Sequence, residues 1–534
     1  MIWNVELCAK SLVIRIIQDK KVEYKMTVTY NQKTKQMARH KMLKKAVELL
    51  TQNRDTICCV RRNYVREVYD FFIELEDSNE SKEAKKIENS YIRMWESVHA
   101  QYVGNKKADE LVVCYFAGPE PENDFNELIS LGVLPQNIWA FESEKNTYLQ
   151  ALESIDSTDF SQPKLIKTSI ERFFENTPKQ FDIVYIDACA PLVSEQHALR
   201  CISTMFKYHR LASPGILISN FADVDSSNEN LMNGYYDAIT KYNIIKKYTD
   251  CTLVEQGGKV SFKNYYEEIY ESVKMNFTRY YGDYITAMIC NVGSIVIPTL
   301  RFVNSTYLNV FSNTQPLRNK VYQFQDINTI KNNTFYKYLA MNCFLKQIDV
   351  KDCGIERIDK LEKELTANWS GYTILQSFQK LYEIREQNIG VNVNIEEYFN
   401  FFEESDSMYQ FLDRPTKKLF IDSVINQLAF PMHYCANNIE RLTYIAKETR
   451  MYMDLIPFDE CRYIYDWLPA VDQMKNAFSN KSWQYVFRFA LDGLVKQRIN
   501  YNNEFFFQGS VISRREPLFK DAIIKEREEI YKGE

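Results

Sequence analysis

The feature that most constrains the fold is a regular alternation of short apolar runs and amphipathic segments between residues 111 and 221. The runs LVVCYFA, IVYI and ILIS are almost continuously apolar, which is typical of strands that are buried on both faces of a parallel sheet. The segments between them have helical spacing. This alternation predicts an α/β domain with a mainly parallel sheet covered by helices on both faces. The predicted strands are 111–117, 137–142, 164–168, 181–187 and 215–221, and the predicted helices are 124–132, 145–155, 170–176 and 195–211.

The segment before this alternation has a different pattern. Residues 1–30 alternate polar and apolar side chains and predict two or three strands, whereas residues 37–50 and 61–77 predict helices. We therefore expect an N-terminal α+β module of strands and helices over residues 1–105.

After the alternation, we predict a loop and a helix in residues 223–280 and two further strands in residues 284–303, joined by a hairpin at Gly293–Ser294. The α/β domain would then cover residues 106–305. From about residue 315 onward the apolar spacing is helical, so we predict an all-α C-terminal domain over residues 306–534. Its predicted helices include 416–430, 436–453, 459–478 and 482–499.

Composition and cysteine spacing bear on the class of the protein and its cellular location. Its 534 residues are 45% hydrophobic and 26% charged, as in ordinary globular proteins. We find no run of about 18 apolar residues and no apolar signal segment, so we expect no membrane association. The 12 cysteines include no CxxC pair and no Cys/His spacing of a zinc site. We therefore expect reduced thiols, no metal site and a cytoplasmic location.

Positive charge is concentrated near the N-terminus. Residues 1–70 contain 15 Lys and Arg against 7 Asp and Glu, although the whole chain has a net charge of -5. On the helix predicted at residues 37–50, basic side chains are expected opposite the apolar stripe: Lys33, Lys35, Arg39, His40, Lys41, Lys44 and Lys45. Such a face can bind the phosphates of nucleic acid or can simply be a solvated helix face, and both interpretations stay open.

The first strand is followed by a motif with chemical meaning, VVCYFAGPEPEND. It is similar to the "hydrophobic strand, then F-A-G-x-G-x" loop of class I S-adenosylmethionine-dependent methyltransferases, and the resemblance extends over roughly residues 110–300. It implies a Rossmann-like, seven-stranded sheet with the cofactor across the carboxyl ends of the first strands. Phe116, Ala117 and Gly118 match the loop, which approaches the methionine part of the cofactor. Glu120 replaces the second glycine; its carboxylate either attracts the sulfonium or amino group or fills the pocket.

Two further motifs follow in the order that the resemblance implies. In IWAFESEK, Glu142 ends the second strand and matches the acidic residue that binds both ribose hydroxyls, because two carboxylate oxygens accept two hydrogen bonds. It can equally be the polar end of a buried strand. In KLIKTSIERFFE, Thr168 and Ser169 match a polar position that contacts adenine, and Ser169 also fits as the N-cap of the next helix.

The fourth motif is FDIVYIDACAPLVSE. The resemblance gives Asp187, at the end of the fourth strand, a catalytic or cofactor-binding role: it orients the substrate nucleophile or the amino group of the cofactor. Cys189 is either a thiolate nucleophile or a structural cysteine. Pro214–Gly215 fits the turn into the fifth strand.

The resemblance thus implies S-adenosylmethionine as cofactor and methyl transfer to a macromolecule, either nucleic acid or protein. An alternative is a catalytically degenerate scaffold that binds a protein or nucleic-acid partner. In both cases the helical C-terminal domain would serve oligomerisation or partner binding. Another doubly wound fold that binds a different nucleotide is a third interpretation.

Overall fold

The computed structural model describes residues 32–75, 78–156, 164–247, 424–467 and 480–497, together with residues 259–308, 355–381 and 516–531 except for single positions within them. The strands predicted in residues 1–30 and several helices predicted after residue 315 lie outside the described residues.

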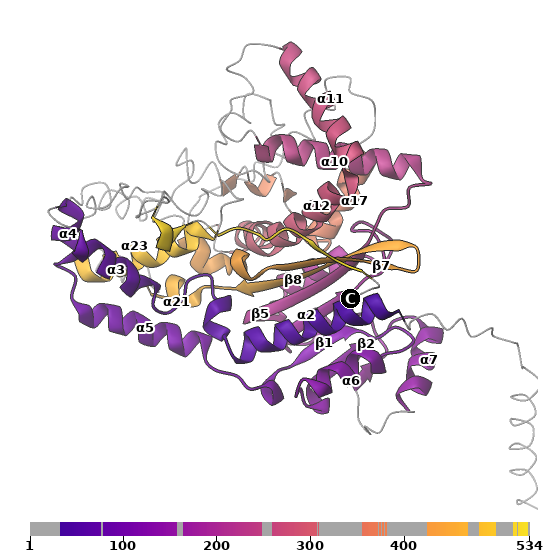
Figure 1. The fold of residues 1–534 in the computed structure, drawn as a ribbon, viewed down its shortest axis with the longest axis horizontal. Coiled ribbons are helices and arrows are strands. Elements are labelled where there is room, and N and C mark those ends of the chain that lie inside the picture. Colours follow the sequence, from indigo (N-terminus) through magenta and orange to yellow (C-terminus); the bar gives the residue numbers. More distant parts are fainter. Residues whose placement is uncertain are drawn as a thin grey trace, which may run out of the picture.

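A nine-stranded sheet forms the centre of the described chain (Figure 1). Its strand order is β3-β2-β1-β4-β5-β8-β7-β9, and β6 pairs with β8. The pairs that join β1 to β5 are all parallel, which confirms the five strands predicted from the alternation. Only β8 runs in the opposite direction to its neighbours β5 and β7. The strands are β1 (Val113–Phe116), β2 (Ile138–Phe141), β3 (Lys164–Ile166), β4 (Phe181–Asp187), β5 (Leu211–Ala222), β6 (His433–Tyr434), β7 (Glu440–Ala446), β8 (Thr449–Asp459) and β9 (Glu528–Ile530).

The hairpin predicted in residues 284–303 is wrong. These residues belong to a continuous helical segment made of α12 (Phe277–Asn291), the π-helical η4 (Val292–Val296) and α13 (Ile297–Val303). The segment is long and apolar enough to cross a membrane, but 89% of its most apolar window is buried inside the protein. A short β-branched apolar run fits a fully buried helix as well as a buried strand, so its periodicity could not distinguish the two.

The C-terminal region is not all-helical. The helix predicted at residues 436–453 is wrong, because these residues form β7 and the first part of β8. Of the helix predicted at 459–478, the short helix α21 (Arg462–Tyr465) is present, and residues 468–478 lie outside the described residues. The helix α23 (Lys481–Lys496) agrees with the one predicted at 482–499. Because β8 pairs with β5 along its length, residues on both sides of the boundary predicted at 305 build one sheet.

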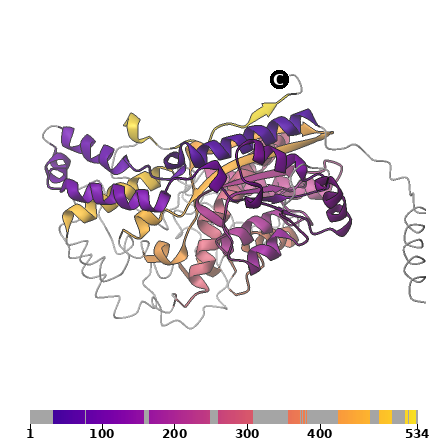
Figure 2. The ribbon, with the colours of Figure 1, turned by 90° about the horizontal axis from the view of Figure 1, so that it is seen from below.

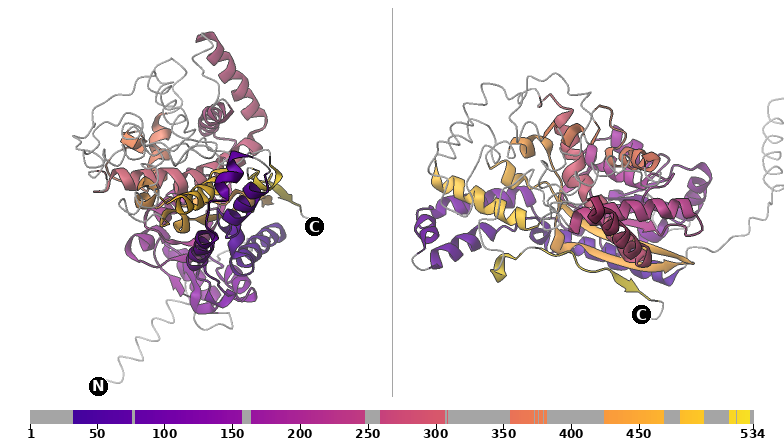
Figure 3. Two further views of the ribbon diagram at one scale, coloured as in Figure 1. Left: turned by 90° about the vertical axis from the view of Figure 1, so that its left-hand side faces the viewer. Right: turned by 90° about the horizontal axis from the view of Figure 1, so that it is seen from above.

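Helices cover both faces of the sheet (Figure 2). On one face, α2 (Lys33–Thr51) and α6 (Glu122–Ser130) share an apolar core with alternate residues of β1, β4, β5 and β8. On the other face, the core includes α8 (Ile170–Asn176), α9 (Ala198–Lys207) and α12. Two long helices, α10 (Glu229–Lys247) and α11 (Lys259–Met275), pack with α12 (Figure 3). The helices α7 (Lys145–Ile155) and α17 (Ile355–Thr366) complete the longer elements around the sheet.

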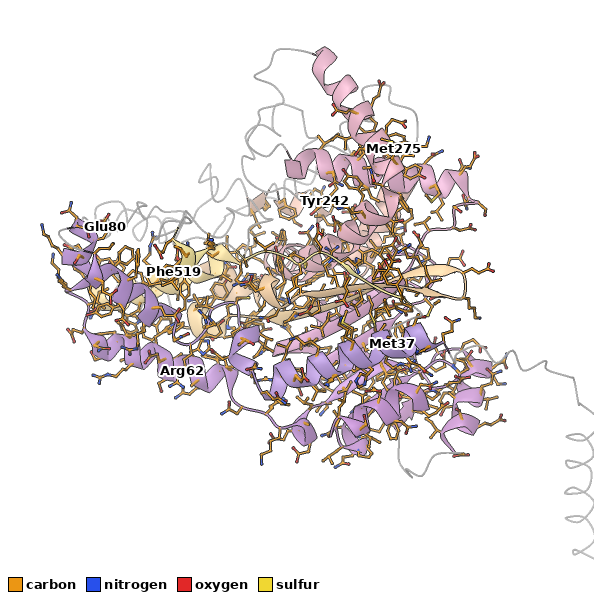
Figure 4. All side chains as sticks on the ribbon, in the orientation of Figure 1. Met37, Arg62, Glu80, Tyr242, Met275 and Phe519 are labelled. Atoms are coloured by element: carbon orange, nitrogen blue, oxygen red, sulfur yellow. The ribbon has the colours of Figure 1, made fainter. Side chains whose placement is uncertain are left out.

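N-terminal and C-terminal helices meet at one end of the sheet (Figure 1). There α3 (Tyr64–Glu74), α4 (Asn79–Ala84) and α5 (Asn89–Val103) lie beside α21 and α23. Phe519 packs edge-on against Tyr64 and Phe71 of α3, with ring centroids 5.7 and 5.4 Å apart (Figure 4). Short turns of helix connect these elements: η1 (Arg54–Ile57), η2 (Ala108–Glu110), η3 (Pro135–Asn137), η6 (Ala436–Asn438) and η7 (Pro517–Phe519).

Candidate functional site

The loop after β1 is open around its glycine. Gly118 has a φ of 60°, in the left-handed region that favours glycine. Apart from its chain neighbours, no atom of the described residues lies within 4 Å of the position that a Cβ would occupy. The preceding residue is fixed to the next strand, because the Ala117 amide donates to the Phe141 carbonyl at 2.9 Å. The turn at Phe116–Gly118 therefore presents backbone to open space at the carboxyl edge of the sheet.

Glu120 is held by the helix that follows. It is half-buried, and its Oε2 accepts a hydrogen bond of 3.1 Å from the side-chain amide of Asn123 on the first turn of α6. The same amide donates to the Glu120 carbonyl at 3.3 Å. Within the described part of the chain no cationic side chain lies within 4 Å of this carboxylate, so its negative charge is not paired at the loop.

Glu142 and Ser169 lie at the same edge of the sheet. Glu142 continues the pairing of β2 with β3, since its amide donates to the Ile166 carbonyl at 3.1 Å. Its side chain is half-buried and accepts a hydrogen bond of 2.7 Å from the Glu144 amide. Ser169 is the N-cap of α8, and its hydroxyl accepts from the Arg172 amide at 3.2 Å, which confirms the predicted cap. Because β1, β2 and β3 are adjacent and parallel, these positions and Gly118 follow three neighbouring strands.

Asp187, at the end of β4, is paired with a lysine. Lys35 of α2 lies 2.8 Å from Asp187 Oδ2, and the two side chains are only 9% and 12% exposed. The other oxygen accepts from the Asn220 amide at 2.8 Å and from the Cys189 thiol at 3.2 Å. The prediction that Lys35 lies on the exposed side of its helix is therefore wrong.

This pair sets the charge states at the end of β4. Burial opposes ionisation of Asp187, but Lys35 and the hydrogen bonds outweigh it and lower the pKa of the carboxyl below its usual value. Conversely, burial alone would lower the pKa of Lys35, but the charge of Asp187 raises it above its usual value. Asp187 is thus an ionised carboxylate whose charge is balanced by Lys35 and which binds a proton weakly. These properties suit a positioning role better than that of a general base.

Cys189 is a thiol rather than a thiolate at neutral pH. Cys189 is an exposed residue, and its sulfur lies 3.9 Å from Nζ of Lys35. Because Lys35 is 154 residues away in the sequence, the residues next to Cys189 do not reveal this cation. However, the protein packed around the thiol and the charge of Asp187 raise its pKa to about 12, against the opposing effect of Lys35. The geometry does not support the thiolate nucleophile.

A second buried ion pair lies one helical turn along α2. Arg39 contacts Asp124 of α6 at 2.7 Å, and the two side chains are 8% and 9% exposed. Burial raises the pKa of Asp124 to about 6, although Arg39 opposes this shift, so the pair is ionised at neutral pH. Arg39 is therefore also buried, contrary to the predicted exposed face. The one signal in the sequence is the spacing of Lys35 and Arg39, which places both on one side of a helix.

The end of β7 also reaches this region. Tyr444 accepts a hydrogen bond of 2.8 Å at its hydroxyl from the Asn220 amide that contacts Asp187. The hydroxyl of Thr34 donates to the Ile445 carbonyl at 2.9 Å, which ties the start of α2 to β7. Sequence reasoning misses these contacts, because the apolar spacing of residues 436–453 predicts a helix where the fold has a strand.

Comparisons with known proteins give partial likenesses. No family model matches the chain, and no curated protein matches it. A solved S-adenosylmethionine-dependent methyltransferase from Clostridium acetobutylicum is similar over 30% of this chain and 57% of its own, with 14% identity and a TM-score of 0.17. Magnesium protoporphyrin IX methyltransferase from Synechocystis, with bound SAH, is similar over 32% of this chain and 76% of its own, with 17% identity and a TM-score of 0.18.

The fold is defined by the strand order rather than by these likenesses. We base the assignment of the fold on the strand order: a mixed α/β, Rossmann-like sheet that is parallel except for β8. In such sheets ligands bind outside the carboxyl ends of the strands, where Gly118, Glu142 and Asp187 lie.

Proposed function

We propose that the carboxyl edge of β1, β2 and β4 binds S-adenosylmethionine and that the protein transfers the methyl group to a macromolecule, with nucleic acid as the substrate. The observation that carries the proposal is the open turn at Gly118, which lies beside the half-buried Glu142 on the neighbouring strand. A glycine backbone lets the amino acid part of the cofactor approach closely. A carboxylate accepts hydrogen bonds from the ribose hydroxyls.

Each residue has a distinct role in this proposal. The Phe116–Gly118 backbone would hold the methionine part, and Glu142 would accept hydrogen bonds from the ribose hydroxyls. Ser169 would place a polar group near the adenine while it caps α8. The unpaired charge of Glu120 would attract the cationic end of the cofactor. Asp187, fixed by Lys35, would orient the acceptor group.

When bound, S-adenosylmethionine supplies an activated methyl group on a sulfonium. Its transfer is an in-line displacement that depends mainly on orientation and exclusion of water. The pairing of Asp187 with Lys35 is therefore compatible with the reaction, since no strong base is required at the end of β4.

Titration calorimetry with S-adenosylmethionine and S-adenosylhomocysteine tests the cofactor. Glu142→Ala should abolish measurable binding because it removes the ribose acceptor, whereas Glu153→Ala, an exposed carboxylate on α7, should bind like the wild type. No heat with either compound at millimolar concentration, or equal binding by both variants, would refute the cofactor site.

A pair of glycines provides a matched test of the loop. Gly104 and Gly118 have φ values of 61° and 60°. At both positions the place that a Cβ would take is free of atoms within 4 Å from the described residues other than the chain neighbours. Gly→Ala should destabilise the protein at both positions through backbone strain, by up to about 3 kcal/mol at Gly104, whose ψ of -175° lies in a region that is essentially confined to glycine. Only Gly118→Ala should also weaken binding of S-adenosylmethionine, because only there would the new methyl group project into the cofactor site.

A second candidate function is a degenerate scaffold. The buried pairs Lys35–Asp187 and Arg39–Asp124 favour it, since they neutralise two carboxylates at the edge where a cofactor and acceptor would meet. In that case wild-type protein should give no heat with either compound. If Glu120→Gly then gains binding, the pocket is present but obstructed by this carboxylate.

A further inference from the structure

Three buried cysteines converge at the end of the sheet opposite the candidate cofactor site. Cys59 follows η1, Cys435 follows β6 and Cys461 follows β8, so they come from three separate parts of the sequence. They are 2%, 1% and 0% exposed. The sulfurs of Cys59 and Cys435 are 3.4 Å apart, a non-bonded distance, and the Cys435 thiol donates to the Ile57 carbonyl.

Asp459 completes the group. One of its oxygens lies 3.5 Å from the Cys461 sulfur, and the ligand atoms of Cys59, Asp459 and Cys461 all lie within 4.8 Å of one another. Cys435 lies outside this group of three and approaches it through the sulfur of Cys59. Asp459 is 1% exposed, yet among the described residues no Lys, Arg or His forms an ion pair with it. Its negative charge is therefore stabilised by hydrogen bonds alone in the absence of a cation.

We propose that Cys59, Cys435 and Cys461, with Asp459 as the fourth ligand, bind a thiophilic divalent cation of the Zn²⁺ type. A tetrahedral Zn²⁺ with sulfur ligands at about 2.3 Å places the sulfurs about 3.8 Å apart, close to the spacing of Cys59 and Cys435. Three thiolates and one carboxylate carry the same total charge as the four thiolates of a common structural zinc site.

The surroundings fix the ligands in place. The amides of Cys59 and Cys461 donate to the two oxygens of Asp459 at 3.0 and 2.9 Å. Ser213 and Tyr463 donate their hydroxyls to the same carboxylate at 3.2 and 2.5 Å. These four hydrogen bonds orient the carboxylate and fill its four acceptor sites, so a cation bound to Asp459 would take the place of one donor. Because all four ligands are buried, the site is closed and its role would be structural: the cation would join the N-terminal segment to β6 and β8.

Zn²⁺ is bound by the thiolate form of cysteine. Binding of the cation must release three thiol protons to solvent, and its affinity must rise with pH. The sequence does not predict this site because its ligands are not arranged as CxxC or Cys/His pairs; the fold brings them together from distant segments.

The test uses the whole 534-residue chain. Its zinc content is measured by mass spectrometry after gel filtration, and the chelator-treated protein is then titrated with Co²⁺ and Zn²⁺ while absorption is recorded. We expect one equivalent of Zn²⁺, and with Co²⁺ the intense visible bands of tetrahedral coordination together with thiolate charge-transfer bands. Cys461→Ala should lose both, whereas Cys201→Ala, a buried cysteine of α9, should keep both.

Two results would overturn the proposal. One is wild-type protein that contains no zinc and gives no thiolate bands with Co²⁺; this spectrum decides the question even if Cys461→Ala does not fold. The other is loss of the metal in Cys58→Ala but not in Cys461→Ala, which would assign the ion to the neighbouring group Asp55, Cys58 and His99. Neither result bears on binding of S-adenosylmethionine, since the two sites lie at opposite edges of the sheet.

Discussion

Replacement of Lys35 by methionine tests the buried ion pair at the end of β4. Lys35 and Asp187 are 2.8 Å apart, which corresponds to a gross attraction of about 6 kcal/mol at the effective dielectric constant of about 20 used for protein sites. The desolvation of both charges offsets much of this attraction. The relevant quantity for Lys35→Met is the cost of leaving Asp187 buried without its cation, and this is typically about 3 to 5 kcal/mol.

We expect the lower end of that range, about 3 kcal/mol, because Asp187 keeps its hydrogen bonds from Asn220 and Cys189. Urea unfolding followed by circular dichroism measures the loss as a shift in the midpoint at unchanged slope. Lys44→Met, at an exposed position on the same helix, should change the free energy of unfolding by less than about 0.5 kcal/mol.

The double variant Lys35→Met/Asp187→Asn separates the pair from other effects of the substitution. With the carboxylate neutralised, methionine no longer leaves a buried charge, so the double variant should be more stable than Lys35→Met alone. If the changes in the free energy of unfolding caused by the two single substitutions add to within about 0.5 kcal/mol, the pair is not coupled, since independent sites behave in that way. A cost of Lys35→Met no greater than that of Lys44→Met would contradict it as well.

Three further predictions concern Asp187, Gly493 and the lysines of α2 that do not face the candidate site. Because the folded state lowers the pKa of Asp187 from its usual 3.8, the stability difference between wild type and Asp187→Asn should be constant at neutral pH and should shrink below about pH 4, as urea titrations at several pH values can measure. Gly493→Ala should destabilise by about 1 to 3 kcal/mol in the same assay, because its Cβ would lie 2.8 Å from the ring of Tyr64. Neutralising Lys41, Lys44 and Lys45 together should weaken nucleic-acid binding and reduce the slope of log affinity against log salt by up to about 3; binding that is absent or independent of salt would reject nucleic acid as the substrate.

The first half of the sheet could be predicted because its strands are distinctive in sequence. β1, β4 and β5 are buried on both faces, so each appears as a nearly continuous apolar run between helical segments. Polar residues at the ends of these runs, such as Glu142 and Asp187, then fall at one edge of the sheet. The order of strands and the position of these carboxylates therefore follow from local patterns.

The rest of the sheet could not be predicted, since local pattern and tertiary environment disagree. Between Tyr284 and Leu300 every residue except Ala287 is buried, so this part of the helical segment has no polar face to reveal a helical period. In β8, residues 451–459 are all buried between the sheet's two layers of helices, so the strand does not alternate polar and apolar residues either. Only the pairing with β5, more than 200 residues earlier in the chain, makes it a strand.

The basic helix α2 shows the same disagreement at the candidate site. Its positively charged residues look equivalent in sequence, but Lys35 and Arg39 are spaced by one turn and face Asp187 and Asp124, while Lys41 and Lys44 are exposed. A count of charges thus overestimates the surface that could meet phosphate and conceals the two cations nearest to the proposed chemistry. What distinguishes them is the partner across the interface, not the helix itself. The helix α2 is therefore part of the carboxyl edge of the sheet, and an enzymatic or scaffold role must be decided with α2 in place.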